Sequence, residues 1–327
     1  MHKLSLTGGV WSACPTPLTD NFQVDRDSVG RMVEHHLQMG VVGLLLAGTC
    51  GEGPCLTDRN REVLTRAAVE SGAGRIRLAL QVTDNSSGRV LDNIERAAAW
   101  GAEVAMVAAP PIFPHASPTR ILGHFQEIVR HSVLPVGFYD GGETFAIPEA
   151  LLPEFLDEPK LVLVKDSSAL ESRIPIYAAS HRRRPELLLL DGDEFACIKY
   201  LEAGYDGLLL GGGVFNARLA GAIVGAIRNG DRPRAEALQK RMNDLMYRVY
   251  GGVQIECWLA GLKELLVEMG IFSTPANLLG YTLIETCRRQ IRDALSGADG
   301  LDYRTDLLGP QTSPVGGPKS VRAQTSA

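Results

Sequence analysis

The chain has 327 residues, 45% of them hydrophobic, and a formal net charge of −5 at pH 7. This length suits a single (β/α)₈ barrel of about 250 residues with an appendage. Acidic and basic residues are interspersed, which argues against nucleic acid or a membrane surface as a partner and favours a small-molecule ligand.

The sequence contains six cysteines, none of them in a C-x-x-C pair. This spacing predicts reduced thiols and a cytoplasmic protein. The first ten residues have no apolar run typical of a signal peptide, and no segment reaches the about 18 apolar residues of a membrane span.

Short, continuously apolar runs follow one amphipathic stretch after another, as is typical of parallel strands buried on both faces. Eight such runs lie at residues 10–14, 43–47, 76–82, 104–109, 135–139, 161–164, 187–190 and 207–210. The segments between them have helical spacing, as at 28–39, 58–71, 88–100 and 119–131. The pattern predicts an α/β protein with a closed (β/α)₈ TIM barrel over residues 1–228. A doubly wound open sheet would instead be expected to carry a glycine-rich phosphate turn after its first strand.

Further helical segments follow the eighth apolar run, at 217–229, 232–249, 253–269 and 277–295. They exceed what the last β/α unit needs, so residues 229–296 are predicted to form a C-terminal helical appendage. Apolar periodicity fades beyond residue 297, where Gly, Ser, Pro, Gln and Thr dominate. Residues 297–327 are therefore predicted to be a disordered tail.

In a barrel of this kind the chemistry sits at the carboxyl ends of the strands. Lys165 directly follows four apolar residues, and a lysine at a dry barrel mouth loses part of its preference for the charged form. A neutral amine can attack a carbonyl. The alternative is a structural lysine paired with Asp166 or another carboxylate.

Tyr139 ends the preceding apolar run, so its phenol is expected near Lys165, where it could move protons during imine formation. The alternative is a tyrosine at the rim that buries its ring and hydrates its hydroxyl.

The turn at residues 48–53, Gly-Thr-Cys-Gly-Glu-Gly, offers a hydroxyl at Thr49 and successive backbone N–H groups that could hold a carboxylate. It could also be only a tight turn before a helix capped by Thr57 or Asp58. Cys50 is not expected to be a nucleophile, because no histidine is evidently placed to activate it. The histidines show no metal-binding cluster, and Asp191 with Asp193 is weak evidence for a metal.

Over roughly residues 10–280 the chain resembles the dihydrodipicolinate synthase and N-acetylneuraminate lyase superfamily of class I aldolases. The resemblance is carried by TPLTD at 16–20, GTCGE at 48–52, His124-Phe125, Tyr139, KDSS at 165–168 and GYDG at 204–207. It implies that Lys165 is the Schiff-base lysine, Tyr139 the acid/base residue and Thr49 part of a hydroxyl relay. It further implies that backbone groups of Thr49, Cys50 and Leu209 bind the 2-keto acid. A homotetramer of tight dimers, without a metal or an organic cofactor, is also implied.

Three departures from the family pattern bear on the substrate. Cys50 replaces the second threonine of the turn, and Phe113 stands where dihydrodipicolinate synthases have a relay tyrosine. Residues 140–145 lack the arginine that would hold the carboxylate of the aldehyde substrate.

These departures favour a lyase, aldolase or dehydratase that acts on pyruvate or a 2-keto-3-deoxy acid. One alternative is 4-hydroxy-tetrahydrodipicolinate synthase, which condenses pyruvate with aspartate semialdehyde. Another is a non-catalytic barrel that binds a keto acid.

Overall fold

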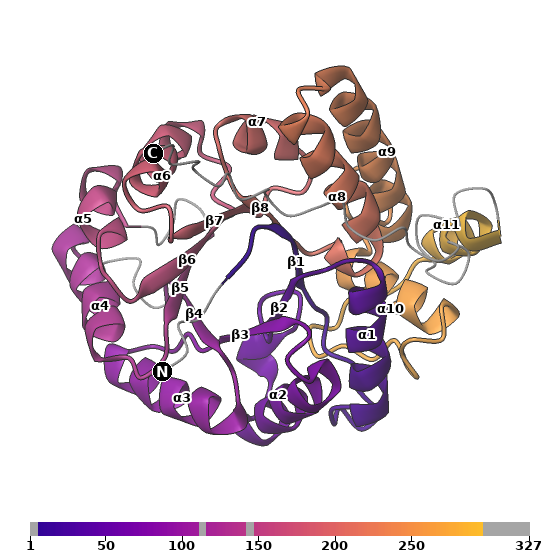
Figure 1. Cartoon of the computed structure of the whole chain (residues 1–327). Helices are drawn as coiled ribbons and strands as arrows, with labels where there is room; N and C mark the ends of the chain where they lie inside the picture. Colours follow the sequence, from indigo (N-terminus) through magenta and orange to yellow (C-terminus); the bar gives the residue numbers. More distant parts are fainter. Residues whose placement is uncertain (1–5, 111–115, 142–146, 297–327) are drawn as a thin grey trace, which may run out of the picture.

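The computed structural model describes residues 6–110, 116–141 and 147–296. Eight parallel strands form a closed barrel in chain order, surrounded by helices (Figure 1). The strands are β1 (Gly9–Ala13), β2 (Gly43–Leu46), β3 (Arg77–Gln81), β4 (Val104–Ala108), β5 (Val136–Asp140), β6 (Leu161–Asp166), β7 (Leu188–Asp191) and β8 (Gly207–Leu210). Because β8 pairs with β1, the (β/α)₈ prediction is confirmed and the open sheet is excluded.

The helices of the β/α units are α1 (Arg26–Gln38), α2 (Asp58–Gly72), α3 (Ser87–Trp100), α4 (Pro118–His131), α5 (Leu152–Leu156), α6 (Ile174–Arg183), α7 (Cys197–Glu202) and α8 (Gly213–Arg228). Several begin at a polar residue whose side chain accepts a hydrogen bond from the first turn, as Thr57 does for α2. Three helices follow, α9 (Arg232–Tyr250), α10 (Trp258–Glu268) and α11 (Glu285–Ser296).

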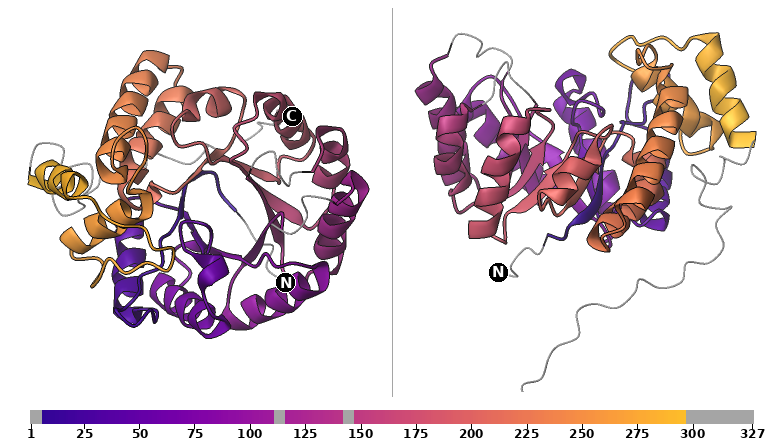
Figure 2. Two further views of the ribbon diagram at one scale, coloured as in Figure 1. Left: turned by 180° about the vertical axis from the view of Figure 1, so that it is seen from behind. Right: turned by 90° about the horizontal axis from the view of Figure 1, so that it is seen from above.

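The helices α9 to α11 lie together on one side of the barrel (Figures 1 and 2). The division at residue 228 falls between α8 and α9 and stays a prediction, and the tail at 297–327 lies outside the described residues. No helix in the described part of the chain combines the length and apolar character needed to cross a membrane.

Two of the C-terminal helices begin later than their spacing predicts. The sequence indicates helices from residues 253 and 277, whereas α10 begins at Trp258 and α11 at Glu285. Gly251, Gly252 and Ile255 all have positive φ, so the backbone after α9 is not helical. Before α11 the backbone N–H of Leu278 donates to the carboxylate of Glu52 instead of forming a helical hydrogen bond.

The barrel interior depends on close packing near its amino-terminal end. Trp11 of β1 is fully buried, and Gly43 of β2 lies beside it in the strand register. A Cβ atom at Gly43 would stand 2.3 Å from the nearest carbon of the Trp11 indole. The indole therefore occupies the space that a side chain at residue 43 would need.

We predict that Gly43→Ala destabilises the protein by about 1 to 3 kcal/mol, because the new methyl group overpacks a rigid aromatic ring. The matched control is Gly123→Ala within α4, where an added Cβ meets nothing within 4 Å. That change should leave stability unaltered or raise it by up to about 1 kcal/mol. Urea unfolding of both variants measures the difference, and equal midpoints would contradict the packing argument.

Candidate active site

The structure brings together two of the side chains that the sequence singles out. Tyr139 of β5 and Lys165 of β6 are partners in the strand register. The Lys165 Nζ lies 4.5 Å from the centroid of the Tyr139 ring, and Lys165 is only 8% exposed. Both residues line a cavity of about 300 Å³ at the carboxyl ends of the strands, together with Thr49 and Cys50. The predicted proximity of the phenol and the amine is confirmed.

The residues that follow this pair point away from the barrel axis, because side chains alternate along a strand. Asp140 forms a buried ion pair with Arg173 and accepts a hydrogen bond from the Tyr177 hydroxyl at 2.6 Å. Asp166 accepts a hydrogen bond from the Tyr205 hydroxyl at 2.7 Å. Each carboxylate thus holds the end of its strand through contacts outside the barrel. Asp166 is engaged by Ser168 and Tyr205, whereas Glu194 is the carboxylate that interacts with Lys165, so the structural alternative stays open for another carboxylate.

The backbone after β7 comes very close to Lys165. A Cβ atom at Gly192 would lie 2.8 Å from Cε of Lys165 and 1.9 Å from Oγ of Ser167. Only a residue without a side chain fits there without a shift of these atoms. The Ser167 hydroxyl is buried and makes no hydrogen bond to the described residues. Ser167 lines the same cavity, so its hydroxyl is a polar group left over for a ligand.

The turn at residues 48–53 forms the wall opposite β6. Thr16 donates through Oγ1 to the Gly51 carbonyl at 2.6 Å, and the Arg61 guanidinium donates to the Gly53 carbonyl at 3.0 Å. Thr49 is exposed, whereas Cys50 is buried. Burial raises the pKa of the Cys50 thiol to about 12, which agrees with the expectation that this cysteine is not a nucleophile.

The loop after β7 contributes two carboxylates to the cavity that sequence reasoning left without a catalytic role. Asp193 and Glu194 both line it. Glu194 accepts hydrogen bonds from the Gly212 N–H at 2.7 Å and from the Tyr250 hydroxyl at 3.1 Å. Burial raises the pKa of Glu194, and the nearby Lys165 amine lowers it in part. The sequence signal was available, since Asp191-Gly192-Asp193-Glu194 directly follows an apolar run.

Two aromatic side chains complete the lining. Phe195 follows Glu194 and stacks on Tyr247 of α9, with ring centroids 5.3 Å apart. Trp258 opens α10 and packs edge-on against Tyr281. Trp258 could not have been identified from sequence, because no local pattern links the start of α10 to a barrel mouth.

The remaining predicted site residues are placed differently. Leu209 is fully buried in β8 beside Trp11 and is not among the residues lining this cavity, whereas Gly211 is. Phe113 and residues 142–145 lie outside the described residues. Within the described ranges, no three His, Cys, Asp or Glu side chains are grouped so that they could hold a metal ion.

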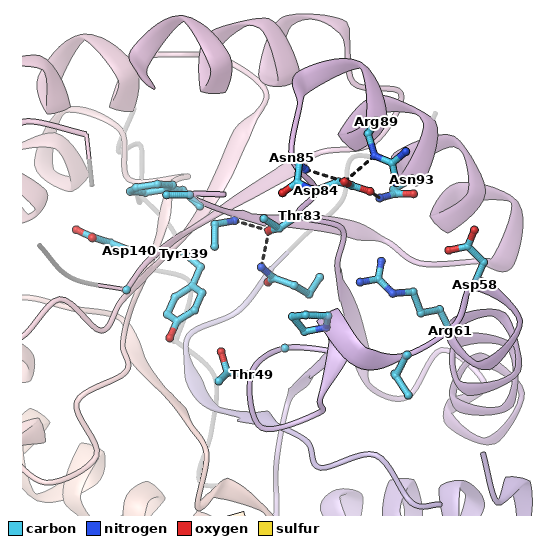
Figure 3. Close-up of a pocket in the computed structure, with 18 residues that line it drawn as sticks. Thr49, Asp58, Arg61, Thr83, Asp84, Asn85, Arg89, Asn93, Tyr139 and Asp140 are labelled. Atoms are coloured by element: carbon cyan, nitrogen blue, oxygen red, sulfur yellow. Dashed lines mark hydrogen bonds and ion pairs between the residues drawn. The ribbon is translucent and has the colours of Figure 1, made fainter. Parts of the chain in front are cut away.

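A second cavity, of about 660 Å³, shares Thr49 and Tyr139 with the first and extends toward α2 and α3. Figure 3 shows its polar wall, in which Asp84 accepts hydrogen bonds from Arg89, Asn85 and Asn93. The cavity therefore offers a mixed set of charged and amide groups.

Comparison with known proteins places these features in a family. The profile of the dihydrodipicolinate synthetase family matches residues 6–296. The 4-hydroxy-tetrahydrodipicolinate synthase of Xanthomonas campestris pv. campestris is 30% identical over 273 residues, which cover 80% of this chain and 85% of the relative. The protein of the same name from an Exiguobacterium species is 28% identical over 275 residues, which cover 82% and 91%.

Solved structures share the fold. Dihydrodipicolinate synthase from Bacteroides thetaiotaomicron matches with a TM-score of 0.81 at 23% identity, over 90% of this chain and 99% of that one. YagE, a prophage protein of the dihydrodipicolinic acid synthase family from E. coli K12 solved in complex with pyruvate, gives 0.78 at 20% identity, over 89% and 98%. The family profile and the curated relatives carry the assignment further: the chain belongs to the dihydrodipicolinate synthetase family and is a Schiff-base-forming lyase of that family.

Proposed function

We propose that Lys165 forms the Schiff base and that the enzyme acts on pyruvate or a 2-keto-3-deoxy acid. The observation that carries the proposal is the position of Lys165, whose amine lies over the Tyr139 ring inside a cavity also lined by Thr49 and Glu194. An amine for attack and a phenol for proton transfer are the two groups that imine chemistry needs.

The first stage joins the substrate to the enzyme. The Lys165 amine gives up a proton and attacks C2 of the keto acid, and the carbinolamine loses water to give the imine. Thr49 and Tyr139 carry protons during this dehydration. The backbone N–H groups of Thr49 and Cys50 bind the substrate carboxylate, with Leu209 contributing from β8. Leu209 itself does not line the cavity, whereas Gly211, two residues further along the chain, does.

The second stage breaks the carbon skeleton. The protonated imine accepts the electron pair of the C3–C4 bond, while Tyr139 takes the proton of the C4 hydroxyl. An aldehyde leaves and an enamine remains, which is protonated at C3 and hydrolysed to pyruvate and free Lys165. Elimination of a hydroxyl group from the same imine would give a dehydratase, and the reverse of cleavage would give condensation.

The carboxylates in the cavity favour a polyhydroxylated substrate. Asp193 and Glu194 can accept hydrogen bonds from hydroxyl groups, whereas neither can supply the positive charge that a second substrate carboxylate needs. Lys165 is the one cationic side chain among the described residues that line this cavity, and it is committed to the imine. The alternative activity, 4-hydroxy-tetrahydrodipicolinate synthesis, is supported by the names of the curated relatives. It would need a cation for the carboxylate of aspartate semialdehyde, and the two arginines in the described lining of the adjoining cavity of about 660 Å³ are already engaged, Arg61 with the Gly53 carbonyl and Arg89 with Asp84.

We also propose a homotetramer of tight dimers and a cytoplasmic location. The family resemblance supports the assembly, and the absence of paired cysteine spacing supports the reducing compartment. Sedimentation of the purified protein would measure the assembly directly.

Borohydride reduction in the presence of pyruvate is predicted to add the mass of a reduced pyruvate adduct to Lys165, because reduction makes the imine irreversible. Intact-mass spectrometry and peptide mapping measure this. Lys165→Ala should show no adduct, and Lys240→Ala, which removes an exposed lysine of α9 that pairs with Asp244 away from the cavity, is the matched control that should keep it. Pyruvate binding without any adduct would favour a non-catalytic keto-acid-binding barrel.

Tyr139→Phe is predicted to keep the fold and slow turnover by about 10² to 10⁴, the usual contribution of a positioned acid/base group. The ring packing against Lys165 is retained, so unfolding midpoints should match those of the native protein. Steady-state kinetics measure the loss. Normal turnover would mean that another group moves the protons.

The carboxylates of Asp193 and Glu194 are predicted to determine the substrate preference. Cleavage of 2-keto-3-deoxy acids should exceed condensation of pyruvate with aspartate semialdehyde in a coupled assay. Glu194→Gln should raise KM for the hydroxylated acids about 10- to 150-fold, the range for a lost hydrogen bond to a charged group. The same change should leave pyruvate trapping nearly unchanged. A higher rate with aspartate semialdehyde would overturn the substrate assignment.

A further inference from the structure

A buried ion pair connects the candidate carboxylate-binding turn to the C-terminal helices. Glu52 ends the Thr49–Cys50–Gly51 stretch of the turn, and Lys263 lies in the middle of α10. The Lys263 Nζ lies 2.5 Å from Oε1 of Glu52, and neither side chain has any exposed surface. Removing two charges from water is costly, so such a pair persists only where its geometry and other hydrogen bonds compensate.

Both members of the pair have further partners. Lys263 also donates to the Ala276 carbonyl at 2.6 Å, and Glu52 accepts from the Leu278 N–H through its second carboxylate oxygen. Burial lowers the pKa of Lys263, while the Glu52 carboxylate raises it in part. The turn is thus tied both to α10 and to the extended chain at 276–278.

The backbone at Glu52 is unusual for its residue type. Its φ is 57°, in the left-handed region where glycine or asparagine is favoured. The contacts of the Glu52 carboxylate with Lys263 and Leu278 help to hold the backbone in this conformation. Within the turn, the Glu52 N–H donates to the Thr49 carbonyl and the Gly53 N–H donates to the Gly48 carbonyl, both at 3.1 Å. A shift of Glu52 would therefore be transmitted to Thr49.

The neighbouring glycines leave the turn little freedom to adjust by itself. A Cβ atom at Gly53 would stand 1.7 Å from the Ala47 carbonyl oxygen, and one at Gly51 would stand 2.9 Å from backbone atoms of Ala47 and Cys14. The turn is packed directly on the end of β2. Besides this packing, the turn is held by Thr16 and Arg61, which donate to its carbonyl groups, and by the Glu52–Lys263 pair.

The same helix that provides Lys263 also provides part of the cavity wall. Trp258, five positions earlier in α10, lines the cavity that contains Lys165. We infer that Glu52 and Lys263 are positioning residues, through which α10 fixes the backbone donors of Thr49 and Cys50 for the substrate carboxylate. This inference rests on the proposed function. By this inference, the C-terminal helix α10 contributes to the geometry of the active site.

The inference is tested with Lys263→Met, Glu52→Gln and the double variant Glu52→Gln/Lys263→Met. The control is Arg292→Met, which breaks the Arg292–Glu268 ion pair between α11 and α10, away from the turn. Each single variant leaves a buried group unpaired, so both should lose stability. The double variant leaves no buried charge, and its unfolding midpoint should recover toward that of the native protein.

Pyruvate trapping then separates an effect on stability from an effect on the position of the turn. The pyruvate concentration that gives half-maximal trapping should rise about 10- to 100-fold in all three variants, including the recovered double variant, because the backbone donors are misplaced. The Arg292→Met control should trap as the native protein does. Half-saturation at the native concentration in the folded double variant would mean that the pair is merely structural.

Hydrogen exchange gives a readout that does not depend on imine formation. Amides of residues 48–53 should exchange at least about tenfold faster in the double variant than in the native protein, and at the native rate in Arg292→Met. Native-rate exchange in the double variant would overturn the inference. If the native protein itself fails to trap pyruvate while exchange responds as expected, the proposed imine function fails and the positioning of the turn stands.

Discussion

The parallel pairing of β5 with β6 is the constraint on which the site depends. It sets Tyr139 beside Lys165 and, one residue further, Asp140 beside Asp166. Because side chains alternate along each strand, one pair faces the cavity and the other faces the surrounding helices. A shift of one strand by one residue would turn its side chains over and place a carboxylate where the amine or the phenol now lies. Closure of the barrel prevents such a shift.

The buried carboxylates outside the barrel support this register. Asp140 is neutralised by Arg173, whereas Asp166 is stabilised by hydroxyl donors from Ser168 and Tyr205. Burial raises the pKa of Asp166 even so, and the neighbouring Asp140 raises it further. Polar groups at this depth are stable only when they are paired, so they fix where the strand ends lie.

Around the cavity, three glycines allow the backbone to come close to neighbouring groups. Gly192 brings the chain after β7 against Lys165, and Gly51 and Gly53 press the turn onto β2. Asp193, Glu194, Phe195 and Trp258 line other parts of the same cavity. The described lining of the cavity thus combines one amine with two carboxyl groups.

The sequence alone was sufficient for the features that depend on local periodicity. Eight buried strands, their order, and the location of Lys165 and Tyr139 at strand ends follow from apolar runs of a few residues each. The helices α10 and α11 were predicted too long, because their spacing continues through segments where positive φ values and a carboxylate acceptor divert the backbone.

Contacts between distant parts of the chain were decided only by the tertiary structure. The Glu52–Lys263 pair joins residues 211 positions apart, and Trp258 reaches the cavity from a helix beyond the barrel. The sequence around Glu52 and Lys263 does not show that they pair, since a glutamate in a turn and a lysine in a helix are ordinary on a solvated surface. Their role depends on their burial, which comes from the contact of α10 with the turn that follows β2 and is encoded in no single stretch of sequence.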